Sequence, residues 1–200
     1  MKRLILLMIT CYCLLPGHAS TDIASDSLLQ VLQTLPHDTT RLSTLNDIIK
    51  IEQNNYKCIQ YSDTLMQEAL KLKNDKYASL AAYYHLLYYY NRSEQDSVAK
   101  WIVQMEPYVQ RSGLWDYFFD AQRFQIDLYT FTEQYELAIS EANKMKQKAL
   151  NIHSNRGTVA AYQCLSNAYI GSQRWDEGLK ALEEAYRLLP KKGNAVVHIK

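Results

Sequence analysis

The 200-residue sequence has few residues that interrupt helices, with only 6 glycines and 4 prolines. So few breakers favour long helices over short strands joined by turns. Its charge is nearly balanced, at 22 Lys and Arg against 21 Asp and Glu, so it lacks the basic excess with which proteins bind nucleic acid or an anionic membrane surface. Beyond residue 13 the cysteines are Cys58 and Cys164. Two cysteines make no disulfide framework, and we interpret both as small core residues.

One long apolar run lies at the N-terminus, over residues 4–15. A basic start precedes it, and residues 16–19 supply a break and small side chains. The run has 12 residues, fewer than the ~20 that cross a bilayer as a helix. This layout predicts a secretory signal peptide over residues 1–19, cleaved after Ala19, and an exported mature chain over 20–200 without a membrane span. An uncleaved N-terminal anchor is the alternative.

The rest of the chain alternates between runs of apolar residues at helical spacing, such as Leu42, Leu45 and Ile49, and short loop signals. Strand-like alternation is absent. Because short loops make consecutive helices antiparallel neighbours, we expect helices packed in pairs. The pattern predicts a leading helix from about Ser25 to Leu35 and then four pairs, over residues 39–74, 76–112, 114–153 and 157–190.

Small residues recur near the start of the second helix of each pair. They are Cys58, Ala99, Ala138 and Gly178, at spacings of 41, 39 and 40 residues. A tight crossing of two helices needs a small side chain, and one such site per pair is typical of a stacked array. For the first two helices, we expect N-caps at Asp26 or Ser25 and at Asp38 or Thr39.

The last pair resembles a tetratricopeptide repeat (TPR). The matching positions are Tyr162, Leu165, Ser166, Tyr169, Trp175, Gly178, Leu182, Ala185 and Pro190. The earlier pairs match less completely, and in the second pair Pro107 should kink or end its helix. The resemblance implies an all-α, right-handed α-solenoid of about four TPR-like pairs with a period of about 40 residues. For the first two pairs alone, other helix-pair repeats of similar spacing remain alternatives.

A second resemblance covers residues 35–42 and 45–48, which read LPHDTTRL and LNDI. This stretch is similar to the start of a family of exported bacterial sensor proteins, in which a TPR array precedes a membrane span and a histidine kinase or DNA-binding domain. The resemblance implies a periplasmic recognition module, the sensory part of a signal-transduction or transcription regulator. A free-standing periplasmic TPR scaffold for protein assembly is the alternative.

Motifs for catalysis are missing from the sequence. The five histidines are not paired at metal-ligand spacing, and there is no Gly-rich phosphate loop, Gly-x-Ser-x-Gly or His-Glu-x-x-His. We therefore expect no enzymatic activity, no cofactor and no metal site. His85 lies in a tyrosine-rich stretch, and we expect it to be a core or groove histidine rather than a metal ligand.

The expected partner is a protein or peptide segment. In TPR arrays the concave groove is lined by first-helix positions that do not hold the pairs together. Mapped onto this chain, the partner-binding residues are Tyr84, Tyr88, Asn91, Arg92, Arg123, Asp127, Gln163 and Asn167, beside Asp47, Lys50 and Asp120. Mere packing is the alternative for the two tyrosines. A solvated inner face, with binding through the convex side or the loops, is the alternative for the whole set.

The C-terminal residues 194–200 predict the start of a further first helix, which stops before it can cover Leu182. A solenoid whose last pair is uncapped leaves an apolar face exposed. We therefore expect a chain that is incomplete at its C-terminus and that can self-associate through its last pair.

Overall fold

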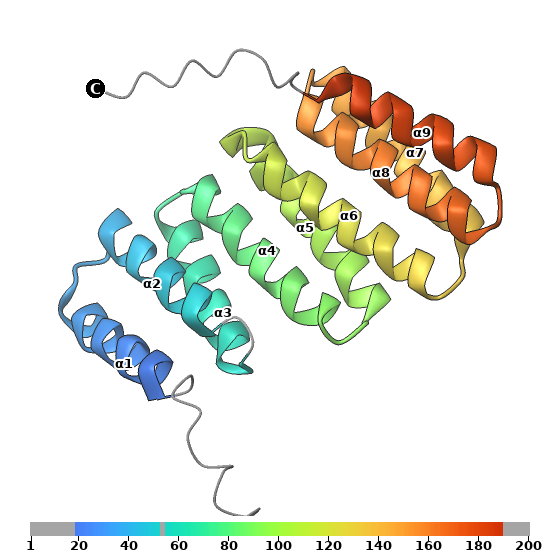
Figure 1. Ribbon diagram of the computed structural model, residues 1–200. Helices are drawn as coiled ribbons and strands as arrows, with labels where there is room; N and C mark the ends of the chain where they lie inside the picture. The colour runs from blue at the N-terminus through green and yellow to red at the C-terminus, as the bar shows by residue number, and fades with distance from the viewer. Residues whose placement is uncertain (1–18, 53–54, 190–200) are drawn as a thin grey trace, which may run out of the picture.

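The computed structural model describes residues 19–52 and 55–189, and within these ranges it contains nine α-helices and no strand. Figure 1 shows the helices stacked in chain order from the blue N-terminal end to the red C-terminal end. The helices are α1 (Ala19–Thr34), α2 (Thr39–Glu52), α3 (Lys57–Lys71), α4 (Asp75–Tyr90), α5 (Gln95–Ser112), α6 (Trp115–Phe131), α7 (Tyr135–Asn151), α8 (Asn155–Gly171) and α9 (Trp175–Leu188). The expected all-α architecture of consecutively packed helices is confirmed, and it is consistent with an α-solenoid. The expected cleavage after Ala19 depends on residues 1–18, which lie outside the described residues, as do residues 194–200 of the expected further helix.

The stack is tighter on one side than on the other. Helices α2, α4, α6 and α8 approach one another successively, with Cα atoms within 8 Å. No such approach joins α3, α5, α7 and α9 to one another in the described part of the chain. We call the side of α2, α4, α6 and α8 the inner side, because these helices lie where the stack is narrowest.

Regular turns set the lengths of the helices. From the end of α3 onward, each turn contains a residue with φ between 51° and 75°, and these residues are Lys73, Ser93, Gly113, Glu133, His153 and Gln173, each 20 residues after the last. After five of them, the next N–H bonds to the carbonyl five residues earlier, as from Arg174 to Tyr169 at 2.8 Å. This is the hydrogen bond of a Schellman helix end. Five of the six positions are not glycine, so each of these five turns accepts roughly 1 kcal/mol of strain for a fixed helix end.

Equal turns also fix which residues are equivalent in the second helices. The N–H groups of Val98, Ala138 and Gly178 each bond to a carbonyl in the turn before their helix, at 2.9 to 3.0 Å. Val98 is therefore the residue equivalent to Ala138 and Gly178, and it is fully buried, whereas Ala99 is only half-buried. The expectation of a small residue at Ala99 is wrong by one position, because the packing there accommodates valine.

Two predicted details at the first helices have different outcomes. Helix α1 begins at Ala19, so Ser25 and Asp26 lie inside it and do not cap it. Asp38 does cap α2, since its Oδ1 accepts hydrogen bonds from the N–H of Thr40 (2.8 Å) and of Arg41 (3.3 Å).

Helix α5 does not end at Pro107 but continues to Ser112. Proline removes the hydrogen bond to the carbonyl of the residue four positions earlier, which is Val103. Both Pro107 and Val103 are exposed, so water can hydrate that carbonyl and the helix survives.

The core runs along the stack between the two layers of helices. Its largest fully buried side chains include Phe118 and Phe119 of α6. Cys58 and Cys164 are free thiols, each 1% exposed, as expected of small core residues. Burial raises the pKa of Cys164 to about 12, so the thiol stays protonated and unreactive at neutral pH.

Candidate binding site on the inner side

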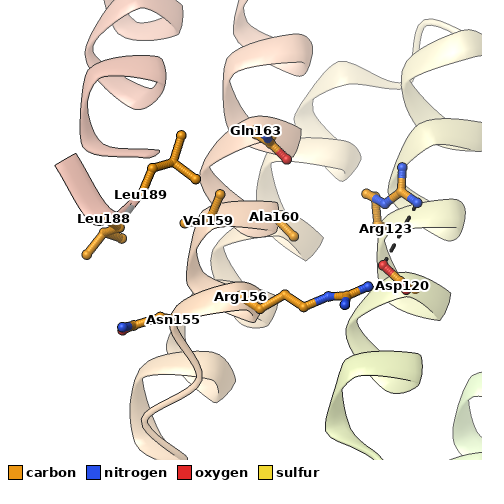
Figure 2. Close-up of a pocket in the computed structure, with 9 residues that line it drawn as sticks. All are labelled: Asp120, Arg123, Asn155, Arg156, Val159, Ala160, Gln163, Leu188 and Leu189. Carbon is orange, nitrogen blue, oxygen red and sulfur yellow. Dashed lines mark hydrogen bonds and ion pairs between the residues drawn. The ribbon is translucent and has the colours of Figure 1, made fainter. Parts of the chain in front are cut away.

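A pocket of about 450 Å³ lies on the inner side, where α6 and α8 meet the end of α9. Figure 2 shows a charged group from α6 on one side of α8 and two leucines at the end of α9 on the other. The lining residues are Asp120, Arg123, Asn155, Arg156, Val159, Ala160, Gln163, Leu188 and Leu189. The pocket therefore combines a polar wall with an apolar wall.

The floor of the pocket is one face of α8. Arg156, Val159, Ala160 and Gln163 follow one another at the three- and four-residue intervals that place side chains on the same side of a helix. Helix α8 begins here because the Oγ of Ser154 accepts a hydrogen bond from the N–H of Gly157 at 3.0 Å.

A close contact between α6 and α8 lies beside this floor. A Cβ placed on Gly157 would be 2.5 Å from Cδ2 of Phe119, so only glycine fits without a shift. The absence of a side chain at Gly157 lets α8 lie directly against α6. The floor of the pocket on α8 is thereby brought close to its polar wall on α6.

Ion pairs join the same two helices at the polar wall. Arg156 of α8 donates from Nη2 to Oδ2 of Asp120 at 2.9 Å, and its Nη1 lies 3.5 Å from Oδ2 of Asp116. The side chains of Arg156 and Asp116 are both more than half exposed, so this contact adds little stability. The hydrogen bond from Arg156 to Asp120 has a positional effect, because it holds the carboxylate of Asp120 at the wall of the pocket.

Arg123 is the second cation of the polar wall, and unlike Arg156 it donates no hydrogen bond to a described residue. Its guanidinium lies 3.9 Å from Asp120 and 4.0 Å from Asp127, too far for hydrogen bonds. It makes no hydrogen bond to a side chain or backbone group among residues 25–52 and 55–189, and 38% of its side chain is exposed. Its N–H groups can therefore bind an acceptor that enters the pocket.

The carboxylate of Asp127 is more enclosed than that of Asp120. Only 19% of its side chain is exposed, and burial raises its pKa although Arg123 opposes the shift. Beside these charges, Tyr83 of α4 packs edge-on against Tyr117 of α6, with ring centroids 5.0 Å apart. Burial and the charge of Asp120 raise the pKa of Tyr83 to about 12, so it remains a neutral phenol.

Tyr84 does not lie on the surface where the sequence placed it. It is 5% exposed, and its hydroxyl donates a 2.8 Å hydrogen bond to Oδ1 of Asn46 on α2. Asn46 is also buried, at 7% exposure. Tyr84 therefore links α2 and α4 inside the core, and the packing alternative holds for this residue. Its assignment to the groove is corrected.

Tyr88, Asn91 and Arg92 lie together at the C-terminal end of α4. The guanidinium carbon of Arg92 is 3.4 Å from the centre of the Tyr88 ring, and its Nη1 donates to the Tyr88 carbonyl at 3.0 Å. Asn91 and Arg92 are exposed, and Tyr88 is half-buried. None of the three lines the pocket between α6 and α8. On α2, Asp47 and Lys50 are exposed and pair with each other at 3.0 Å.

The pocket brings together three of the groove positions named from the sequence, Asp120, Arg123 and Gln163. Asp127 does not line the pocket, but it forms an ion pair with Arg123, which does. Asn167 is exposed on α8, four residues after Gln163, and does not line the pocket either. Sequence reasoning missed Asn155, Arg156, Val159 and Ala160, although extending the helical stripe of Gln163 toward the N-terminus of α8 would have found them. No sequence signal marked Leu188 and Leu189, because their position depends on how α9 packs.

His85 is a core residue, 2% exposed, and its ring stacks on that of Trp101 at 4.0 Å. Its Nε2 lies 3.2 Å from Oδ1 of Asp63, and neither ring nitrogen makes a hydrogen bond to a described residue. Burial lowers the pKa of His85, and the nearby Asp63 only partly opposes this. The ring is therefore neutral at neutral pH.

Among the described side chains, no group of three or more His, Cys, Asp or Glu residues could hold a metal ion. No helix within residues 19–52 and 55–189 is long and apolar enough to cross a membrane. Comparisons with protein-family models, with curated proteins and with solved structures find no match, so the resemblance to TPR proteins rests on the residues of this chain alone.

Proposed function

We propose that this protein is an exported recognition module that binds a protein or peptide segment in the pocket between α6 and α8. The observation that carries the proposal is Arg123, a partly exposed cation that makes no hydrogen bond to a described residue and lines a pocket of about 450 Å³. An unused charged donor beside apolar side chains favours ligands that offer both an acceptor and an apolar group.

An extended polypeptide offers both at regular intervals. Its carbonyl or carboxylate oxygens can accept hydrogen bonds from Arg123, and its amides can bond with Gln163, whose side chain both donates and accepts. An apolar side chain of the segment can contact Val159, Leu188 and Leu189 at the opposite wall. The alternation of polar backbone and apolar side chain thus matches the two walls of the pocket.

Two cellular settings fit such a module, and both are proposals from the resemblance. In the first, the chain is the periplasmic sensory part of a bacterial signal-transduction or transcription regulator. In the second, it is a free-standing periplasmic scaffold that assembles other proteins. The coding sequence downstream of residue 200 separates them, since an in-frame membrane span followed by a kinase or DNA-binding domain supports the first and contradicts the second.

We also propose that the chain self-associates through its last helix pair. The support is the exposed apolar surface of α9, where Trp175, Leu179 and Tyr186 are each more than half exposed. A continuous apolar surface of this kind marks an interaction site more often than a solvated face.

Photo-crosslinking in the producing cell tests the binding proposal. With p-benzoylphenylalanine in place of Gln163, ultraviolet light should yield a discrete adduct with another polypeptide, and Arg123→Ala should remove that adduct. The matched control places the same group at Gln104, an exposed glutamine on α5 away from the inner side. Adducts of equal yield at both positions, or none at Gln163, would show that the pocket is not the binding site.

A further inference from the structure

An apolar stripe runs along the outer surface of α9. Trp175, Leu179, Leu182 and Tyr186 are 63%, 57%, 49% and 76% exposed. Their spacing of four, three and four residues places them on one side of the helix. The stripe is therefore a continuous apolar surface that no described residue covers.

The equivalent surface of α7 is a helix interface. The equal turns make Tyr135 equivalent to Trp175, Ala142 to Leu182 and Lys146 to Tyr186. On α7, Tyr135 lies so close to α8 that a Cβ on Gly171 would be 2.4 Å from its ring.

The other equivalents on α7 are covered in the same way. Ala142 is fully buried, against 49% exposure for Leu182. Lys146 lies over the ring of Tyr162 on α8, with Nζ 5.3 Å from its centre. On α7 this surface is covered by α8, whereas on α9 no described helix covers the equivalent surface.

The surface of α9 also has the shape of a helix-packing site. A hollow of about 330 Å³ is lined by Leu179, Leu182, Glu183, Tyr186 and Arg187. The first four stand at positions i, i+3, i+4 and i+7, which is the set of four residues that receives one side chain from a facing helix. The hollow is therefore suited to an aliphatic side chain from a second helix.

We propose that the occupant is α9 of a second copy of this chain, packed antiparallel about a two-fold axis. The spacing of four, three and four is the same in both directions, so an antiparallel copy places Trp175 opposite Tyr186 and Leu179 opposite Leu182. Each Leu179 then enters the hollow of the other copy. A two-fold contact of this kind is self-complementary and closes at two copies.

The exposed area supports a weak dimer. From the exposed fractions, the four side chains present roughly 500 Å² per copy, or about 1,000 Å² for both, close to the lower limit for a specific interface. The dimer should therefore dissociate on dilution. This antiparallel arrangement rests on the proposed self-association, and it specifies which residues of the two copies contact each other.

Sedimentation equilibrium of the full chain tests the interface. The wild-type chain should be in monomer–dimer equilibrium, and Leu182→Glu should weaken the dimer about 30-fold or more, because Leu182 lies next to the axis. Val103→Glu is the matched control, since Val103 is also exposed, at 71%, but lies on α5, and it should leave the dimer unchanged. A wild-type monomer at every concentration, or equal effects of the two variants, would overturn the proposal.

Disulfide mapping tests the geometry separately, in a background with Cys11→Ser and Cys13→Ser. Chains carrying Trp175→Cys, mixed with chains carrying Tyr186→Cys, should form the mixed disulfide at least tenfold faster than either forms its own. The helical circular dichroism of each variant checks that it folds. Dimers that cross-link equally in all combinations would retain self-association but refute the antiparallel two-fold arrangement.

Discussion

Replacing Tyr84 by phenylalanine removes one hydroxyl group from the core and should destabilise the fold measurably. The hydroxyl donates a 2.8 Å hydrogen bond to Oδ1 of Asn46, and both residues are buried. The substitution leaves this amide oxygen without its donor, at a cost of about 1–3 kcal/mol. The melting temperature should fall by about 2–4 °C for each kcal/mol in a chain of this length.

Urea denaturation followed by circular dichroism measures this loss. Tyr88→Phe is the control, because Tyr88 contacts its neighbours through its ring and should lose less than ~0.5 kcal/mol. The double variant Tyr84→Phe with Asn46→Leu should be less destabilised than the sum of the two single changes, since no polar atom is then left unpaired. Equal stability of Tyr84→Phe and the wild type would refute the buried link between α2 and α4.

Two further predictions concern His85 and Gly157. Burial lowers the pKa of folded His85 below the 6.5 of the free side chain, so the unfolded chain binds the proton first and stability should be lost as the pH falls through about 6.5 and below. Unfolding free energies measured from pH 7.5 to 5 should show less of this loss in His85→Phe; the same slope in both proteins would refute the role of His85. Gly157→Ala should destabilise the fold by about 1–3 kcal/mol despite alanine's higher helix propensity, because buried Phe119 cannot give way. A Gly157→Ala variant as stable as the wild type in urea would show that the contact between α6 and α8 is loose.

The helical fold could be predicted because its signals are local. Few breakers, helical apolar spacing and loop residues such as Gly113 are read without knowledge of tertiary contacts. The prediction that α1 starts at Ser25 was wrong, because residues 19–24 contain no helix-breaking residue and no change in hydrophobic spacing that would mark the true start at Ala19. The prediction that Ala99 is the small packing residue of α5 was wrong for a different reason. The turn at Ser93 decides which residue of α5 faces the neighbouring helix, and composition does not reveal this.

The candidate site could be predicted only in part, since it depends on contacts between helices. Helical phase correctly brought Arg123 and Gln163 to the inner side. Helical phase could not distinguish Tyr84 from Tyr88, because the difference lies in the hydrogen bond that the Tyr84 hydroxyl donates to Asn46 of α2. Leu188 and Leu189 reach the pocket from the end of another helix, which a periodic pattern within α8 cannot reveal.

The central claim is that the pocket between α6 and α8 binds a polypeptide segment, and its most direct test is an affinity measurement. The probe is the polypeptide cross-linked at Gln163, titrated calorimetrically against the full chain and its variants. Arg123→Ala should weaken binding by about 2 kcal/mol, or roughly 30-fold, whereas Lys100→Ala, at an exposed cation on α5, should leave it unchanged. The same affinity for Arg123→Ala and the wild type, with the fold intact, would contradict the claim.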